Sequence, residues 1–244
     1  NIYIYIMTEN VSHQARFSEA TYRMLESGNK DQRIARINAD LEDTGYVVDR
    51  QHSNRDVLTL RNETDGKSVV AVRGTDTSGK KTGIDVMADI TFALGQSHHS
   101  NEFRKRRNRI KNALKDTNDD DKVILTGHSL GSGVIKHSIA NSNQIRRRVI
   151  DNGEVHTFNA ASHPFLRDQT KVSKASKKAL EDKVVHHRTR NDVVSKGLET
   201  MIPFGKVKTY DTKTSNFTKK MPKGLASTFN SLEALHAHKL IHFK

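Results

Sequence analysis

The sequence predicts an α/β protein with a mixed, mostly parallel sheet and helices on both of its faces. Strand-like and helix-like segments alternate through the middle of the chain, which is typical of parallel strands joined by helical crossovers. Near the front, strand-like segments follow one another directly, which indicates strand-to-strand pairing there. The chain has 244 residues, enough for one large domain with a real core. We expect a single domain over 1–244, with an N-terminal helix and strands in 1–68 and the catalytic core in 69–244.

The front of the chain contains most of the segments that we expect to pair directly. "NIYIYIM" at residues 1–7 alternates with period two and predicts a strand, whereas residues 11–28 predict an amphipathic helix that ends at "SGN". Residues 44–76 predict three strands joined by turns at "SNRD" and "ETDG". The third of these strands, within "SVVAVRG", has a continuously apolar centre, as expected of a strand covered on both faces.

The rest of the chain alternates between the two kinds of segment. Residues 83–95 are a short apolar stretch bounded by glycines, and residues 101–117 predict a helix with Phe103, Ile110 and Leu114 on one side. The later segments, in chain order, are a strand in 119–127, a helix in 132–142, strands in 153–162, 182–192 and 205–213, and a histidine-rich helix or loop in 231–244.

The amino-acid composition excludes several kinds of site and leaves the localisation open. The chain has no cysteine, so it has no disulfide, no thiolate metal site and no thiol nucleophile. No apolar run approaches the ~20 residues that a membrane-spanning helix needs. The first residue is Asn rather than Met, so a targeting segment removed before it would be invisible, and the localisation stays open. We expect a protein that is soluble or peripheral to a membrane, and the missing disulfides fit an intracellular or virion-associated setting.

The charge is strongly basic, with a formal net value of +13. Lysines and arginines crowd into residues 103–115, 146–148 and 171–178. Each cluster alone is accounted for equally well as a solvated helix face. Together they favour an anionic partner, which could be a phospholipid surface, a nucleic acid or an acidic scaffold.

One short stretch carries the strongest chemical signal. In "VILTGHSLGSG", a strand-like segment runs into Gly-x-Ser-x-Gly, formed by Gly127, Ser129 and Gly131, and a helix-like segment follows. In this setting the pattern predicts a nucleophile elbow, a sharp turn that holds the serine hydroxyl out above the carboxyl ends of the strands. Glycine is needed on both sides, because larger side chains would collide with neighbouring elements. The alternative is a glycine-rich turn that only binds an anion.

A serine hydroxyl needs a base, and the base needs an orienting acid. In proteins with this elbow, the acid and then the histidine follow the serine along the chain. Asp192 comes soon after a strand in the turn-forming "RND", although any such aspartate could simply support a turn. Asp182 and Asp211 are worse placed, because one precedes its strand and the other lies beyond the next.

The base should come from near the C-terminus, where three histidines lie close together. Spacing alone does not separate His236, His238 and His242. His128, next to the serine, should point away from the hydroxyl on such a turn.

A developing oxyanion needs two donors. The N–H of Leu130 would be one, and the end of the strand beside the nucleophile strand should supply the other. In "VVAVRGTD", Gly74 allows a close turn and Thr75 offers an N–H and a hydroxyl. The alternative is a plain turn at the end of a strand.

These residues resemble the class 3 lipase family, the fungal triacylglycerol lipase type of α/β hydrolase. "SVVAVRGTD" is similar to its oxyanion strand, "DVMADITFALG" to the aspartate-containing stretch after it, and "KVILTGHSLGSGVIKHSIA" to its nucleophile elbow. "VHTFNAAS" and "VVHHRTRNDVVS" are similar to its next two strands. The likeness runs from about Val69 to the C-terminus and implies an α/β-hydrolase fold.

The resemblance also implies a role for each candidate residue. It implies Ser129 as the nucleophile, Asp192 as the orienting acid, and Thr75 with Leu130 as the oxyanion donors. It implies His238 as the base, because "AHKLIHF" is similar to the "AHSLxNF" ending of smaller, virus- and microbe-type members.

Three departures from the family stand out. The family usually has Gly-Gly-Ala where this chain has Gly131-Ser132-Gly133, which is still small enough for close packing. The secreted fungal members carry disulfides, and this chain has no cysteine. Their hydrophobic lid corresponds here to residues 77–99, which are few and only partly apolar, so gating at an oil surface is not expected.

The sequence therefore predicts a serine carboxyl-ester hydrolase that acts on lipid, a lipase or phospholipase, through a Ser-His-Asp triad and an acyl-enzyme. No cofactor or metal is expected, and no HExxH or similar ligand spacing occurs. The expected substrate is a lipid ester, at an anionic membrane surface if the charge is used for docking. The alternative is a basic structural or nucleic-acid-associated protein, for instance inside a virion, that retains the hydrolase fold with little or no activity.

Overall fold

The computed structural model describes residues 2–75, 101–117, 120–160, 172–190 and 204–211. Seven strands form one sheet in the order β1-β2-β3-β4-β5-β6-β7. The first three strands pair antiparallel and the remaining pairs are parallel, so the sheet is mixed and mostly parallel. The strands are β1 Val47–Val48, β2 Val57–Arg61, β3 Ser68–Val72, β4 Val123–His128, β5 Gly153–Phe158, β6 Val184–Thr189 and β7 Lys206–Tyr210.

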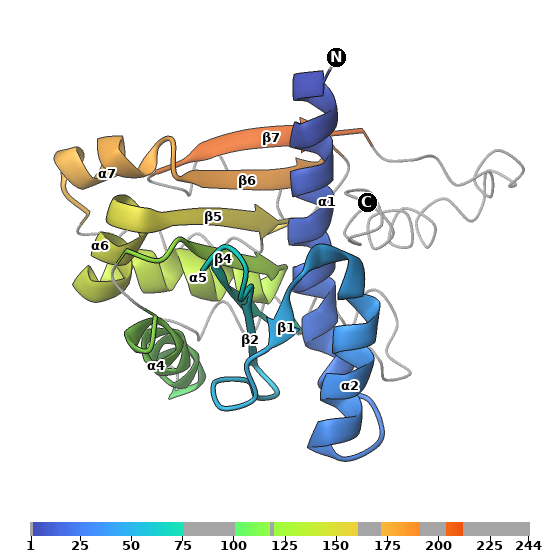
Figure 1. Ribbon diagram of the computed structural model, residues 1–244. Coiled ribbons are helices and arrows are strands. Elements are labelled where there is room, and N and C mark those ends of the chain that lie inside the picture. Colours follow the sequence, from blue (N-terminus) through green and yellow to red (C-terminus); the bar gives the residue numbers. More distant parts are fainter. Residues whose placement is uncertain (1, 76–100, 118–119, 161–171, 191–203, 212–244) are drawn as a thin grey trace, which may run out of the picture.

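Helices cover both faces of this sheet (Figure 1). On one face α1 packs on β3 and β4, with α2 beside it; α4, α5 and α6 lie on the other face. The helices are α1 Ile2–Arg23, α2 Lys30–Asp40, α4 Asn101–Lys115, α5 Leu130–Asn141, α6 Asn143–Asn152 and α7 Lys174–Leu180, with a short 3₁₀ turn at Glu42–Thr44. None of the helices within the described residues combines the length and the hydropathy that a membrane span requires.

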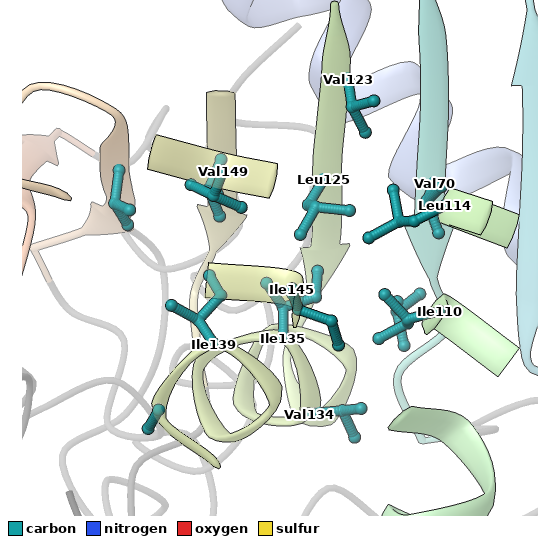
Figure 2. Packing of buried hydrophobic residues seen from close by; sticks show 14 of the residues in the cluster. Val70, Ile110, Leu114, Val123, Leu125, Val134, Ile135, Ile139, Ile145 and Val149 are labelled. Atoms are coloured by element: carbon teal, nitrogen blue, oxygen red, sulfur yellow. The ribbon is translucent and has the colours of Figure 1, made fainter. Parts of the chain in front are cut away.

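The alternation of side chains along β3 explains why this strand is apolar throughout. Val70 and Val72 are buried in the core formed with α4, α5 and α6, whereas Val69 and Ala71 are buried in the core under α1 and α2. Successive strand residues point to opposite faces, so a strand covered on both sides has no polar face. Figure 2 shows the first of these cores, with Leu125 of β4 above the apolar side of α5.

Most predicted elements are confirmed. The three front strands, the helix beginning at residue 101, the strand and helix on either side of Ser129, and the three later strands all occur. The short helices α2, α6 and α7 were not expected from the sequence. Their apolar residues are few, and tertiary packing rather than a strong pattern stabilises them. The predicted segments in 83–95 and 231–244 lie outside the described residues.

The prediction of a strand at residues 1–7 is wrong. Residues from Ile2 onward form the first turns of α1. The helix predicted over 11–28 instead begins at residue 2 and ends at Arg23. Extending an existing helix adds one backbone hydrogen bond for each residue that is fixed and carries no nucleation cost, so a neighbouring helix can override a short alternating pattern.

Candidate active site

The turn between β4 and α5 has an unusual backbone. Ser129 has φ 55° and ψ −122° and directly precedes the first residue of α5. Among the non-glycine residues that the structure describes, only Ser129 and Asn159 have positive φ. Such a conformation costs on the order of 1–3 kcal/mol and persists only where the surroundings enforce it.

Two glycines allow this turn to lie against β3. A β-carbon on Gly131 would lie 2.1 Å from the carbonyl oxygen of Val72, and one on Gly127 would lie 3.0 Å from the same oxygen. Two atoms cannot approach to 2.1 Å in this way, so the backbone of β3 or of α5 would have to move. The spacing of the two glycines is therefore a packing requirement of the turn.

Ser132, which the sequence pattern marks only as a small residue, fixes the turn to β5. Its hydroxyl donates to the carbonyl of Gly127 at 2.5 Å and accepts from the N–H of Phe158 at 3.1 Å. The N–H of Ser129 donates to the Phe158 carbonyl at 3.0 Å. The signal that could have revealed this role is the position of Ser132 in the first turn of a buried helix, where a hydroxyl requires a partner.

Ser129 does not use its hydroxyl as helix-capping serines do. It occupies the N-cap position of α5, yet its side chain makes no capping hydrogen bond. Ser142 and Ser173, at the N-caps of α6 and α7, accept from the N–H of Ile145 and Ser176. The Ser129 hydroxyl is buried and has no hydrogen-bond partner within the described part of the chain. Most buried polar groups in native proteins do have a partner, so this hydroxyl is an exception.

The exposure expected of this hydroxyl is not found. Ser129 is only 2% exposed, rather than held out in solvent above the strands. The expected turn is present, but a reagent or substrate could reach the oxygen only after a local movement.

The end of β3 lies beside this serine. Val72 pairs with Gly127 in the parallel register, so Thr75 and Leu130 each follow three residues beyond a paired position. A β-carbon on Gly74 would lie 3.3 Å from Cβ of Ser129. The Thr75 hydroxyl is also buried without a hydrogen-bond partner among the described residues. The Thr75 and Ser129 hydroxyls, neither with a described partner, therefore lie just beyond the carboxyl ends of the neighbouring strands β3 and β4.

The N-terminal helix also reaches this edge. Tyr22 of α1 lies 3.0 Å, hydroxyl to Nδ1, from the ring of His128, which the sequence predicted to point away from the serine hydroxyl. Two residues before His128 in β4, the Thr126 hydroxyl lies 2.7 Å from the Ser18 hydroxyl of α1. These contacts attach α1 to the strand that leads into the turn.

The proposed acid and base, Asp192 and His238, lie outside the described residues, as do His236 and His242. The two aspartates judged worse placed are described. Asp182 pairs with Lys206 at 2.5 Å and Asp211 pairs with Arg190 at 2.8 Å, with both carboxylates about four-fifths exposed. Each takes part in a surface ion pair.

The strand that leads toward Asp192 is anchored at its end. The N–H of Thr189 donates to Oδ1 of Asn159 at 2.9 Å, and the N–H of Asn159 donates to the carbonyl of His187 at 2.8 Å. Asn159, with φ 43°, thus ties the ends of β5 and β6 together.

Two buried bases behind the turn have lowered pKa values. Lys136 of α5 is 8% exposed, and burial lowers its pKa to about 7. Burial, together with the nearby Lys136 charge, lowers the pKa of His186 to about 3. The His186 ring lies between the Thr157 hydroxyl at 2.6 Å and the Phe204 carbonyl at 3.2 Å.

No group of three or more histidine, aspartate or glutamate side chains in the described ranges is arranged to hold a metal ion.

Several residues of the basic clusters bind within the protein. Arg106 and Arg109 of α4 pair with Asp56. Arg146 donates to two main-chain carbonyls at the end of α5, and Arg148 donates to the carbonyl of residue 121. These guanidinium groups stabilise helix ends and turns. Among the cluster residues that the structure describes, the exposed cations are Arg104, Lys105 and Lys115 on α4, Arg147 on α6, and Lys174 and Lys178 on α7.

The sheet order, the flanking helices and the strained serine turn define the α/β-hydrolase fold. Lipase II from Rhizopus niveus has this fold and is similar to the chain with a TM-score of 0.56 and 15% sequence identity, covering 86% of this chain and 83% of the lipase. A lipase from Rhizopus microsporus var. chinensis aligns with a TM-score of 0.45 and 14% identity over 78% of this chain and 68% of its own. The resemblance to class 3 lipases is thus confirmed at the level of the fold. No family model and no curated protein sequence matches the chain.

Proposed function

We propose that the protein is a serine carboxyl-ester hydrolase that acts on lipid. One observation carries the proposal. Ser129 lies in a strained turn at the N-terminus of a helix, yet its hydroxyl neither caps that helix nor bonds any other described residue. Backbone strain and an unsatisfied buried hydroxyl are both unfavourable for stability, so their coincidence at one residue indicates a chemical role.

The proposed reaction proceeds through an acyl-enzyme. The Ser129 oxygen attacks the ester carbonyl while its proton passes to His238, and Asp192 stabilises the imidazolium that forms. The N–H of Leu130, the first residue of α5, has no acceptor within its own helix and is available to the oxyanion. Thr75, at the end of the neighbouring strand, supplies the second donor. The imidazolium then protonates the leaving alcohol, and water releases the acyl group by the same steps.

The lipid substrate is supported by the fold of the Rhizopus niveus lipase. A phospholipid, rather than a neutral glyceride, is favoured by the net charge of +13. Each basic residue near an anionic membrane contributes about 1 kcal/mol, so the exposed cations could hold the enzyme at such a surface. Binding to liposomes should then weaken with added salt and with fewer anionic lipids, and binding indifferent to both would remove the case for phospholipid.

The test of the proposal is ester hydrolysis by matched variants. Ser129→Ala, Asp192→Asn and His238→Gln should each lower kcat on a soluble aryl ester by about a thousandfold or more. Ser142→Ala, which removes a serine that does cap a helix, should leave kcat unchanged. If His236→Gln or His242→Gln abolishes turnover while His238→Gln does not, the base is reassigned. Wild-type protein without hydrolysis of any ester would overturn the proposal.

A second candidate function is a basic structural or nucleic-acid-associated protein, for instance inside a virion. The observation in its favour is the outer side of α4, where Lys105 and Lys115 are exposed without a carboxylate partner among the described residues. An inactive wild-type protein that binds nucleic acid with strong salt dependence would support it.

A further inference from the structure

A cluster of arginines surrounds the segment that leads into Thr75. Three guanidinium groups converge on the single carboxylate of Asp56, which precedes β2. Arg73 approaches its Oδ1 at 3.1 Å, Arg106 approaches the same oxygen at 3.5 Å, and Arg109 binds Oδ2. Arg73 and Arg106 are 9% and 6% exposed, so the cluster is largely shielded from water.

Two of these arginines also bind consecutive carbonyls of the main chain. Nη1 of Arg106 donates to the carbonyl of Arg73 at 2.8 Å, and Nη1 of Arg73 donates to the carbonyl of Gly74 at 3.1 Å. Nε of Arg73 is itself occupied by the carbonyl of Arg55 at 2.7 Å. The Arg73 guanidinium therefore has several simultaneous partners that fix its plane.

The geometry of the peptide unit converts this carbonyl contact into an orientation of Thr75. A trans peptide is planar, so its N–H points opposite to its C=O. The carbonyl of Gly74 and the N–H of Thr75 belong to one peptide unit. The hydrogen bond from Arg73 to the Gly74 carbonyl therefore sets the direction of the Thr75 N–H. The hydrogen bond from Arg106 to the Arg73 carbonyl restricts rotation of the peptide unit before it.

We infer that Arg73, braced by Asp56 and Arg106, is a positioning residue that aims the Thr75 N–H at the oxyanion of the reaction. This inference rests on the proposed function. Arginine suits the position because its planar fork donates in several fixed directions at once, which a lysine ammonium on a flexible stem does not reproduce. Preorganised donors stabilise an oxyanion without reorganising during the reaction, so misdirecting one donor should slow chemistry more than it weakens substrate binding.

The test compares Arg73→Met with Arg109→Met, the matched control. Arg109 binds the same carboxylate through an ion pair and, unlike Arg73 and Arg106, is not bonded to the carbonyls of residues 73 and 74, so its loss reports on the ion cluster alone. For a soluble aryl ester, we expect Arg73→Met to lower kcat by about tenfold or more with little change in KM. Affinity for an alkyl boronic acid, whose tetrahedral adduct on serine resembles the intermediate, should fall in parallel. Arg109→Met should change neither value by more than about twofold.

Two further variants separate the fork geometry from charge and from a failure to fold. Arg73→Lys keeps the positive charge but not the fork, and it should remain as slow as Arg73→Met; full recovery would show that charge alone matters and would overturn the inference. If Arg73→Met does not fold, Arg106→Met is the second variant, because it releases the carbonyl of Arg73 and one contact to Asp56 while the Arg73 side chain stays in place. It should show the same fall in kcat at unchanged KM. Equal kcat in all folded variants would overturn the inference alone. A wild-type protein that neither hydrolyses esters nor binds the boronic acid would overturn the proposed function and the inference together.

Discussion

The carbonyl oxygen of Val72 lies 2.1 Å from the point where a β-carbon on Gly131 would stand. This relationship makes β3 and the start of α5 interdependent, because neither can move without opening the turn around Ser129. It also places the two segments that supply the proposed oxyanion donors in direct contact.

Replacing the two turn glycines should have graded effects on stability. Gly131→Ala forces a backbone displacement and should lower the free energy of unfolding by about 3 kcal/mol or more. Gly127→Ala meets its nearest atoms at 3.0 Å, so its cost should be smaller, about 1–2 kcal/mol. Urea unfolding followed by circular dichroism measures both, and equal costs would contradict the closer approach at Gly131.

Ser132 should be structurally important although it takes no part in the proposed chemistry. Ser132→Ala leaves the Phe158 N–H and the Gly127 carbonyl without this hydroxyl partner and should cost about 1–3 kcal/mol of stability. Ser138→Ala is the matched control, because the Ser138 hydroxyl lies on the same helix and is buried without a hydrogen-bond partner in the described ranges. The melting temperature should therefore fall for Ser132→Ala and should stay the same or rise for Ser138→Ala, which removes an unsatisfied hydroxyl.

The strain at Ser129 predicts a trade between stability and activity. Ser129→Gly permits φ 55° without the steric penalty and removes an unsatisfied hydroxyl, so it should raise the free energy of unfolding by about 1 kcal/mol while abolishing turnover. Asn159→Gly relieves a similar φ but loses the acceptor for the Thr189 N–H, so it should give no such gain. A destabilised Ser129→Gly protein would show that the turn is not strained.

The buried Lys136 should make stability depend on pH in a defined window. Its folded pKa of about 7 lies below the ordinary 10.5, so between these values the unfolded chain binds more protons than the folded chain. Stability therefore rises with pH across that window, by up to about 1.4 kcal/mol per pH unit, and Lys136→Met removes this dependence. The variant's advantage over wild type should be largest below pH 7 and small near pH 10.5. A difference in unfolding free energy between Lys136→Met and wild type that does not vary with pH would show that the Lys136 ammonium is solvated in the folded protein.

The fold was largely predictable because its signals are local. The apolar centre of β3 is typical of a strand covered on both faces, and the Gly-x-Ser-x-Gly pattern that begins in β4 is typical of a sharp turn from a strand into a helix. The strand predicted at residues 1–7 failed because a period-two pattern over so few residues is also compatible with a helix that continues farther along the chain.

The surroundings of the site were less predictable than the turn itself. The bonds that Ser132 makes to β5, and those that Arg73 makes to its own turn, join residues through tertiary packing that leaves no periodic trace in the sequence. The burial of Ser129 could not be inferred either, because a motif specifies backbone geometry and not what covers it. The same limit applies to the basic clusters, several of whose members bind carbonyls or Asp56 inside the protein.

The most direct test of Ser129 as the nucleophile is covalent labelling by a small alkyl fluorophosphonate, with and without vesicles of anionic lipid, followed by mass spectrometric mapping of the modified peptide. We expect a single phosphonylated residue, Ser129, in the wild-type protein and no labelling of Ser129→Ala. Faster labelling with vesicles would indicate that the lipid surface promotes the movement that uncovers this buried hydroxyl. A wild-type protein that stays unlabelled under both conditions, or a Ser129→Ala protein that is labelled as fast as wild type, would contradict the claim that residue 129 is the nucleophile.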